Sequence, residues 1–401
     1  MQPCFLILIV SCFISVMSSS HELLRRVAYV PPKWMLNSIN PAVIPKSKLE
    51  LGRFPTPFHA WNLDGVLKDN PKNLQFLIKR DDLSSFDLSG NKVRKLQFLL
   101  ADAQEKQCDS VITIGGVQSN HARATAVAAR QLGMDPWLIL RTTKADDEEV
   151  LQTSFTGNLL FDRMVGAHVQ TVTSSTYATV GSNNLVDQLH EQLKEQGRNP
   201  YPIPVGGSNT VGVFGYLDAI NELLAQNIEF DHLVFACGSG GTAAGLSIGA
   251  RLSGIAKHVH AIGVCDSPEY FYSHITDTAT ELGLDFETIG KPEDWLHIHH
   301  GAGQGYARNK PEELEFIMAV SQQSGILLDP VYSGKGFYYF VNEYLEANGH
   351  LFDENDKVMF LHTGGVYGLY DKTERGEMTD ILISNDKGSF SAMNVTYPES
   401  T

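Results

Sequence analysis

Short apolar runs alternate with longer amphipathic stretches along most of the chain. The stretch 91–107 shows the helical pattern most clearly, because Leu96, Leu99, Leu100 and Ala103 follow the spacing i, i+3, i+4, i+7. Further helices are predicted at 121–132, 157–165, 184–195, 214–226, 242–253, 311–324 and within 332–347. Strands are predicted at 75–79, 110–114, 136–140, 167–172, 201–204, 232–237, 259–264 and 357–362. This alternation predicts an α/β protein with parallel sheets, which bind ligands at the carboxyl ends of their strands.

The composition is that of a globular protein, and its 401 residues suggest two or three domains. The net charge of −15 argues against a nucleic-acid partner and against stable docking on an anionic membrane, since both need a basic face. The five cysteines are widely spaced and include no C-x-x-C pair. They predict neither a disulfide scaffold nor a cysteine zinc site, and they fit a reducing compartment.

The N-terminus begins with an apolar run at 5–17, which is too short to span a bilayer comfortably. It resembles the hydrophobic region of a signal peptide, but no Lys or Arg precedes it. Two interpretations stay open for residues 1–20: a targeting segment, or an extension with no folded role. We therefore leave these residues out of the fold prediction.

A glycine-rich loop at 238–242 connects a predicted strand to a predicted helix. Its backbone N–H groups and the following helix N-terminus favour a phosphate. A tight turn whose glycines serve packing only is the simpler alternative. Gly238, Gly240 and Ala243 also satisfy a loose dinucleotide fingerprint, with Asp266 after the next strand as the ribose-binding acid. That fingerprint usually opens its domain, whereas here it comes late in the chain.

Lys92 lies at the start of a predicted helix, within the segment 89–95. Arg94, Lys95 and the helix N-terminus are expected to disfavour the ammonium form and to lower the pKa of Lys92. A lysine that forms a Schiff base needs a lowered pKa. The alternative is an ordinary solvated lysine on a helix.

The strand-to-helix turn at 115–121 carries Ser119 and Asn120 next to the free N–H groups of a helix start. These groups suit a bound carboxylate. Both residue types are also favoured as helix N-caps, so a purely structural role stays open.

Two further segments carry polar side chains. In the segment 329–335, Tyr332 ends an apolar run and is either a site residue or a buried turn tyrosine. His297, His299 and His300 resemble a metal-binding group if they lie on a strand. No carboxylate or cysteine stands nearby at ligand spacing, so a metal site is not predicted.

Together these segments resemble the fold type II enzymes that use pyridoxal 5'-phosphate (PLP), and more closely the D-cysteine desulfhydrase and 1-aminocyclopropane-1-carboxylate (ACC) deaminase family. The resemblance runs from about Leu51 to Lys372, most of the chain. It is carried by the motifs KRDDLSSFDLSGNKVRKLQFLLADA, ITIGGVQSNHARATAVAA, PYPIPVGGSNTVGVFGY, ACGSGGTAAGLSIG, GYA at 305–307, LDPVYSGKG and LHTGG.

The resemblance implies a role for each matching residue. Lys92 would form a Schiff base with PLP, and Asn120 would hydrogen-bond its phenolic oxygen. Lys92, Ser119 and Tyr332 would be catalytic, as candidate bases for the Cα proton. The implied cofactor-binding residues are Lys92, Asn120, Gly238, Ser239, Gly240, Gly241, Thr242, Ser333 and Thr363. The implied substrate-binding residues are Gln118, Ser119, Asn120, Tyr306 and Tyr332.

Two positions distinguish the subfamilies. ACC deaminases carry Glu after the tyrosine of DPVY and Leu in LHxGG, where this chain has Ser333 and Thr363. A carboxylate beside the pyridine nitrogen would stabilise a pyridinium and a deeper electron sink than a hydroxyl does. Ring opening of a cyclopropane needs that stronger sink, whereas elimination of thiolate needs less. We therefore expect the substrate to be D-cysteine.

Four alternatives stay open. The same fold can act as an ACC deaminase, or as a lyase for D-serine or β-chloro-D-alanine. A dinucleotide-binding dehydrogenase would use Gly238, Gly240 and Asp266, but it leaves Lys92 without a role. A protein that carries PLP without catalysis is the last alternative, and the tyrosines and Ser119 count against it.

The resemblance also implies a domain plan with PLP in the cleft between two open twisted parallel-sheet domains. The expected segments are 1–20 as a targeting segment, 21–91 with 206–380 as the large domain, 92–205 as the small domain, and 381–401 as a mobile tail. A homodimer is the habit of the family. A mitochondrial or cytoplasmic location is favoured, with secretory targeting by the apolar run as the alternative.

Overall fold

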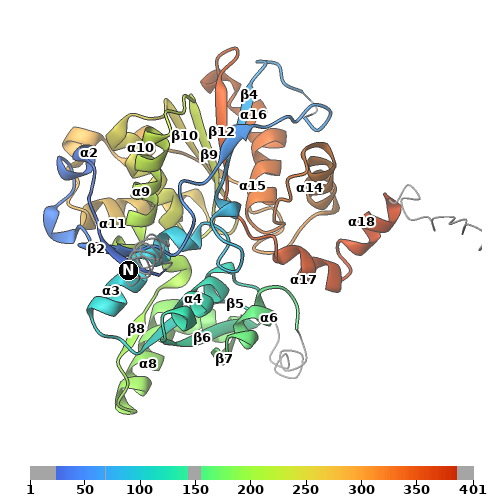
Figure 1. Cartoon of the computed structure of the whole chain (residues 1–401). Coiled ribbons are helices and arrows are strands. Elements are labelled where there is room, and N and C mark those ends of the chain that lie inside the picture. Colours follow the sequence, from blue (N-terminus) through green and yellow to red (C-terminus); the bar gives the residue numbers. More distant parts are fainter. Residues whose placement is uncertain (1–23, 68, 143–154, 386–401) are drawn as a thin grey trace, which may run out of the picture.

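The computed structural model describes residues 24–67, 69–142 and 155–385 (Figure 1). Residues 1–20, where the targeting segment is expected, lie outside this range. The strands are β1 Arg26–Ala28, β2 Ser47–Leu49, β3 Phe58–Ala60, β4 Gln75–Arg80, β5 Ser110–Gly116, β6 Asp135–Thr142, β7 His168–Thr173, β8 Pro200–Pro202, β9 His232–Cys237, β10 His258–Gly263, β11 His297–His300 and β12 Lys357–His362.

The helices are α2 Lys33–Leu36, α3 Lys92–Glu105, α4 Asn120–Gln131, α6 Gly157–Met164, α7 Ser174–Val180, α8 Ser182–Glu195, α9 Thr210–Ala225, α10 Gly241–Ser253, α11 Pro268–Glu281, α12 Phe286–Ile289, α13 Pro292–Trp295, α14 Pro311–Ser324, α15 Ser333–Tyr339, α16 Leu345–Ala347, α17 Gly368–Glu374 and α18 Thr379–Ser384. A π-helical turn, Phe340–Tyr344, connects α15 to α16. In the described part of the chain, no helix combines the length and the apolar character needed to cross a bilayer.

The larger sheet has the strand order β11-β10-β9-β12-β4-β3 and is parallel except for β3, which runs antiparallel to β4. One face packs against α9, α10 and α11, through residues such as Phe235 and Phe214. The other face packs against α14 and α15, through residues such as Phe360 and Phe337. Because both faces are covered, the strands are apolar nearly throughout, which is why the sequence pattern identified them.

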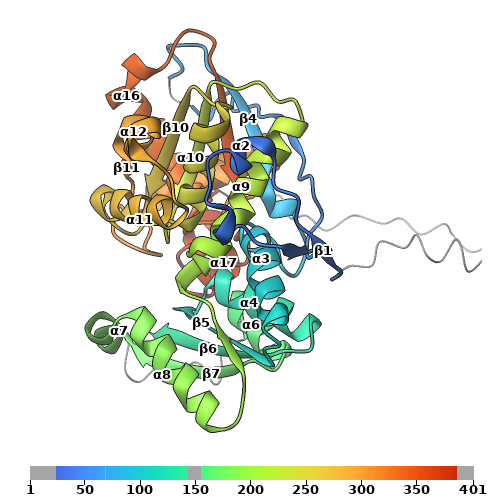
Figure 2. The ribbon, with the colours of Figure 1, turned by 90° about the vertical axis from the view of Figure 1, so that its left-hand side faces the viewer.

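The smaller sheet has the order β7-β6-β5-β8 and is entirely parallel. It lies below the larger sheet in Figures 1 and 2, with α3, α4 and α6 on the side nearer the larger sheet. Helix α8 covers the opposite face through Leu185, Leu189 and Leu193. The predicted α/β class with two parallel sheets is therefore confirmed, with β3 as the one antiparallel strand of these two sheets.

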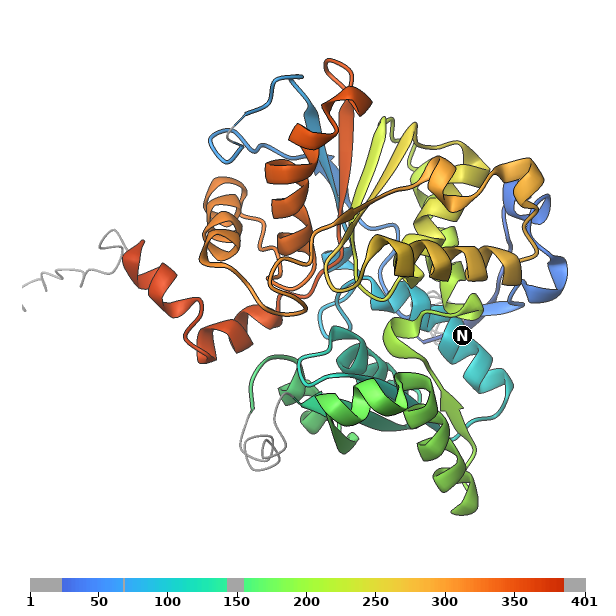
Figure 3. The same ribbon diagram turned by 180° about the vertical axis from the view of Figure 1, so that it is seen from behind.

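Several elements differ from the sequence-based expectation. Helix α11 and the short strands β1, β2 and β3 were not predicted. Residues 381–384, expected to begin a mobile tail, instead complete α18 (Figure 3). Ile381 in this helix is buried against the core. Ile381 and Met378 both belong to the apolar core on this side, and their burial holds the helix in place. The polar residues around them hid this contact from the sequence analysis. Residues 386–401 lie outside the described range.

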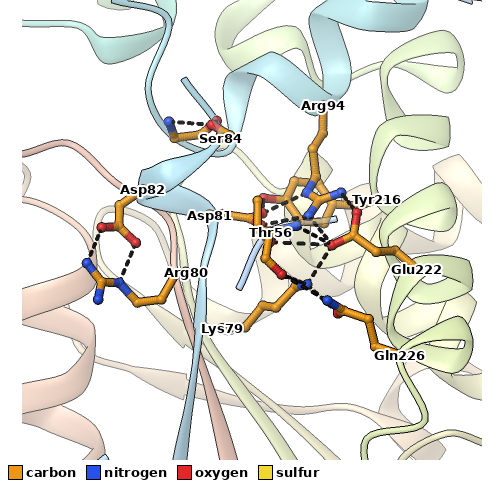
Figure 4. Close-up of polar contacts among 11 residues, drawn as sticks. Thr56, Lys79, Arg80, Asp81, Asp82, Ser84, Arg94, Tyr216, Glu222 and Gln226 are labelled. Carbon is orange, nitrogen blue, oxygen red and sulfur yellow. Dashed lines mark hydrogen bonds and ion pairs between the residues drawn. The ribbon is translucent and has the colours of Figure 1, made fainter. Parts of the chain in front are cut away.

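A buried ion network joins β4, α3 and α9 (Figure 4). Arg94 donates two hydrogen bonds to Asp81, at 2.8 and 2.7 Å, and two to Glu222, at 2.9 and 3.0 Å. Lys79 donates to Glu222 at 2.5 Å, and Tyr216 donates to Asp81 at 2.8 Å. Burial alone would raise the pKa of Asp81, but the charge and hydrogen bonds of Arg94 hold it below its usual range. The network fixes the first turn of α3, and therefore the position of Lys92.

Replacing one carboxylate of this network should destabilise the fold strongly. In Asp81→Asn the shape is kept, but Arg94 and Lys79 lose a buried counter-charge. We expect the free energy of unfolding in urea to fall by about 3 kcal/mol or more. Asp353→Asn, at an exposed ion pair with Lys257, is the control and should change it by less than about 1 kcal/mol. Equal, small effects of both substitutions would contradict this account.

Candidate active site

A cavity of about 840 Å³ opens at the carboxyl ends of strands from both sheets. Of the residues singled out from the sequence, those that line it are Lys92, Ser119, Asn120, Gly238, Ser239, Gly240, Thr242, Ala243, Asp266, Tyr306, Tyr332 and Thr363. Gln118, Gly241 and Ser333 are not among the lining residues. Segments far apart in the sequence therefore meet around one space, as expected for parallel sheets.

Lys92 is the first residue of α3, and its amine lies beside the turn that contains Gly206. A Cβ at Gly206 would lie 3.3 Å from Lys92 Nζ, so a side chain at this position would crowd the amine. Burial lowers the pKa of Lys92 to about 8. The sequence analysis expected the charge of Arg94 to lower the pKa of Lys92. In the structure Arg94 does not do so, because Asp81 and Glu222 neutralise its charge.

The glycine-rich loop is tied to the start of α3. Asn91 Nδ2 donates a hydrogen bond of 3.0 Å to Thr242 Oγ1. Gly241 N donates to Ser208 Oγ at 3.1 Å, and Ser208 Oγ lies 2.8 Å from Ser239 Oγ. These bonds hold the loop at the N-terminus of α10, where N–H groups and the helix dipole favour an anion.

The sequence did not indicate that Lys95 is buried. It is fully buried one turn along α3, and its Nζ donates a hydrogen bond of 3.0 Å to Gly206 O. Burial, and the neighbouring charge of Lys92, lower its pKa well below the usual value. Lys95 is not among the residues that line the cavity; its hydrogen bond instead holds the turn at Gly206 that lies beside the Lys92 amine.

Ser119 and Asn120 stand at the N-terminus of α4. Ser119 Oγ accepts a hydrogen bond of 3.1 Å from Ala122 N, so the N-cap role left open by the sequence is present. Asn120 Oδ1 is buried and has no hydrogen-bond partner among the described residues. Since buried polar atoms are normally satisfied, the Asn120 amide is available to a group bound in the cavity.

The Gln118 side chain does not line the cavity and bonds instead to the residues at the start of α6. Its Oε1 accepts a hydrogen bond of 2.8 Å from Asn158 N, and its Nε2 donates one of 3.3 Å to Thr156 O. These bonds tie the turn before α4 to the start of α6. Gln118 therefore braces this turn in the structure, whereas the sequence analysis places it in contact with substrate.

The two tyrosines form a hydrogen-bonded pair, with 3.0 Å between the hydroxyls of Tyr306 and Tyr332. Asp329, which the sequence analysis did not single out, orients this wall: its carboxylate accepts the N–H groups of Val331, Tyr332 and Ser333 at 3.0, 2.8 and 2.6 Å. Burial raises the pKa of Tyr332 well above its usual value, so this hydroxyl stays protonated near neutral pH.

Ser333 lies behind Thr363. The two side-chain oxygens are 3.0 Å apart, and Ser333 Oγ also accepts a hydrogen bond of 3.2 Å from Thr363 N. Ser333 is fully buried, whereas Thr363 faces the cavity. The Thr363 hydroxyl therefore stands at this part of the wall, backed by the buried hydroxyl of Ser333 rather than by a carboxylate at position 333.

The histidines of β11 take no part in the site. His297, His299 and His300 lie on the edge strand of the larger sheet, and His297 stacks on His260. Within the ranges that the structure describes, no group of three or more His, Cys, Asp or Glu residues is arranged to hold a metal ion.

Comparison with known proteins gives a consistent result. Residues 49–364 match the model of the family described as pyridoxal-phosphate dependent enzyme. The chain is 42% identical over 386 residues to the bifunctional D-cysteine desulfhydrase/1-aminocyclopropane-1-carboxylate deaminase, mitochondrial, of Arabidopsis thaliana, covering 94% of this chain and 90% of the relative. It is 34% identical to the D-cysteine desulfhydrase of Yersinia enterocolitica, covering 74% and 88%. A crystal structure of an ACC deaminase homologue superposes with a TM-score of 0.70 at 32% identity, covering 84% of this chain and 98% of that one.

The residues around the cavity fit PLP. Lys92 offers an amine of lowered pKa for the aldehyde, and the loop at 238–242 offers N–H groups for the phosphate. Asn120 lines the cavity, where its Nδ2 is the donor that a ring oxygen needs and its unpartnered Oδ1 can accept from a bound donor. Gly238 lets the ring of Tyr332 pack directly on the glycine-rich loop, because a Cβ there would lie 2.8 Å from Tyr332 Cε1. The donor set therefore favours PLP over a dinucleotide.

The pKa of Lys92 predicts how PLP loading depends on pH. Only the neutral amine attacks the aldehyde, so the rate of covalent loading should rise with pH to a midpoint near 8. The measurement is the rate at which the visible absorption band of lysine-bound PLP appears in protein stripped of cofactor. A midpoint near 10, the value of an ordinary lysine, would contradict the burial of this amine.

Proposed function

The chain belongs to the family of pyridoxal-phosphate-dependent enzymes, and from this premise we propose that it catalyses the α,β-elimination of D-cysteine to pyruvate, hydrogen sulfide and ammonia. The observation that carries the choice of substrate is the pair of hydroxyls of Ser333 and Thr363, 3.0 Å apart, with Thr363 at the cavity wall and Ser333 buried behind it. A hydroxyl leaves a pyridine nitrogen largely neutral, which suffices to expel a good leaving group such as thiolate. The names of the Arabidopsis and Yersinia relatives support the same substrate.

The geometry suggests a division of roles among the residues. Bound PLP makes the substrate Cα proton acidic by drawing electrons from Cα. Lys92 is our candidate base for that proton, because its side chain lines the cavity and its pKa of about 8 lets Nζ accept a proton near neutral pH. Tyr332 stays protonated near neutral pH because its pKa is raised, and it suits the opposite role, donating a hydrogen bond to the departing sulfur while it accepts one from Tyr306. Ser119 and the N-terminus of α4 would hold the substrate carboxylate.

Deamination of ACC is the second candidate. The Arabidopsis relative, which covers nearly the whole chain, bears both activities in its name. No carboxylate stands at position 333 to support the stronger electron sink, so we propose that ACC is the poorer substrate.

The proposal also covers the domain organisation, the oligomeric state and the location of the protein. We propose two domains, 21–91 with 206–380 and 92–205, and a homodimer, both supported by the family resemblance. A mitochondrial location is supported by the name of the Arabidopsis relative. Light scattering of the purified protein tests the dimer, and a monomeric mass would contradict it.

The direct test uses the PLP-loaded protein with D-cysteine, with pyruvate and sulfide measured together. Both products should appear in equal amounts, and ACC should give a 2-oxo acid more slowly. A loaded protein that turns over ACC but not D-cysteine would contradict the substrate assignment.

Lys92→Ala should lower the turnover of D-cysteine by about a thousand-fold or more, because the amine that binds PLP and accepts the Cα proton is removed. Lys106→Ala, at an exposed lysine just after the end of α3, is the matched control and should keep full activity. Near-normal activity of Lys92→Ala would show that another group carries the chemistry.

The double substitution Ser333→Glu with Thr363→Leu should shift the substrate preference. A carboxylate at 333 stabilises a protonated ring nitrogen, so ACC turnover should rise and D-cysteine turnover should fall. The readout is the ratio of kcat/KM for the two substrates. A ratio that stays within about two-fold of the unsubstituted enzyme would refute the role of these hydroxyls.

A further inference from the structure

Arg141 is a charged residue of the cavity wall that neither the sequence motifs nor the family resemblance includes. It lies at the carboxyl end of β6, where its Cα pairs with that of Gly116 on β5. Its side chain lines the cavity together with Ser119 and Asn120. The pairing places Arg141 one strand away from the turn that leads into α4.

Two aromatic rings hold the guanidinium of Arg141. The group lies 5.0 Å from the ring centroid of Tyr177 on α7 and 5.5 Å from that of Tyr306. Tyr306 in turn lies over Gly116, since a Cβ there would be 3.8 Å from Tyr306 Cε1. Contacts with ring faces restrict the guanidinium but leave the N–H groups at its edge for a ligand.

Within the described part of the chain, no carboxylate compensates the charge of Arg141 locally. Among the residues that the structure describes, Arg141 makes no ion pair within 4.0 Å, in contrast to Arg94 in the buried network. The carboxylates that line the cavity, Asp266, Asp277 and Glu281, come from the larger-sheet side. The cavity therefore has a cationic wall at β6 and an acidic wall at α11, and an anionic ligand group is favoured at β6.

We propose that Arg141 binds the α-carboxylate of the amino-acid substrate, together with the N-terminus of α4, and so selects amino acids over simple amines. A planar guanidinium matches the two oxygens of a carboxylate, whereas a departing hydrosulfide offers one weak acceptor atom. The substrate amine must reach Lys92. A carboxylate held between β6 and α4 therefore gives the substrate a second point of attachment and fixes its orientation. This inference rests on the proposed function only in taking the substrate to be an α-amino acid.

The test compares D-alanine with D-alaninamide, which has the same size but no anionic carboxylate. Neither carries a leaving group, so binding is read from the change in visible absorption of the PLP-loaded protein, without turnover. In Arg141→Met the affinity for D-alanine should fall by about 10- to 100-fold relative to that for D-alaninamide. Arg141→Lys should recover part of the loss. Arg26→Met, at an exposed arginine of β1, should leave both affinities unchanged.

Two outcomes overturn the proposal: unchanged D-alanine binding, or an equal loss for both ligands, which would make Arg141 a support for Tyr306 only. If Arg141→Met does not retain PLP, Arg141→Gln and Arg141→Lys give the same comparison of ligands. The proposed function fails separately, if the unsubstituted protein binds D-alanine but releases no pyruvate from D-cysteine.

Discussion

The carboxylates of Asp81 and Glu222 lie in the interior between β4, α3 and α9, and Arg94 and Lys79 together neutralise their two charges. A buried charge without a partner costs several kcal/mol, so these elements can approach only in the arrangement that completes the network. Gly215 on α9 permits that approach, because a Cβ there would lie 2.6 Å from Lys95 N. The first turn of α3 is fixed as a result, and Lys92 stands at the carboxyl ends of the strands rather than at the surface.

The remaining walls of the cavity depend on the same turn. Asn91 donates through its side chain to Thr242 and through its backbone N–H to Thr363 O, both at 3.0 Å. Thr363 then meets Ser333, whose own position is set by Asp329. One short segment thus positions the lysine, the glycine-rich loop and the hydroxyl pair relative to one another. The geometry of the site therefore depends on the contacts that this segment makes with the other walls, more than on any single motif.

Much of this architecture was predictable from the sequence. Strands buried on both faces are runs of apolar residues, and the glycine-rich turns mark their carboxyl ends. The sequence could not show which charges pair across the interior, so Arg94 was expected to act on Lys92 when it neutralises Asp81 instead. The buried position of Lys95, the orienting role of Asp329 and the outward bonds of Gln118 likewise depend on partners distant in the chain. The helix α11 was missed because its Thr, Ser and Tyr residues weaken the apolar periodicity.

The central claim is that these segments form one PLP site with Lys92 as its covalent residue. Reduction of the PLP-loaded protein with borohydride makes the bond between cofactor and lysine permanent, and peptide mass spectrometry then locates it. The account predicts a pyridoxyl group on Lys92, with fragment ions that separate it from Lys95. Labelling of Lys95, of a lysine outside α3, or of none would contradict it.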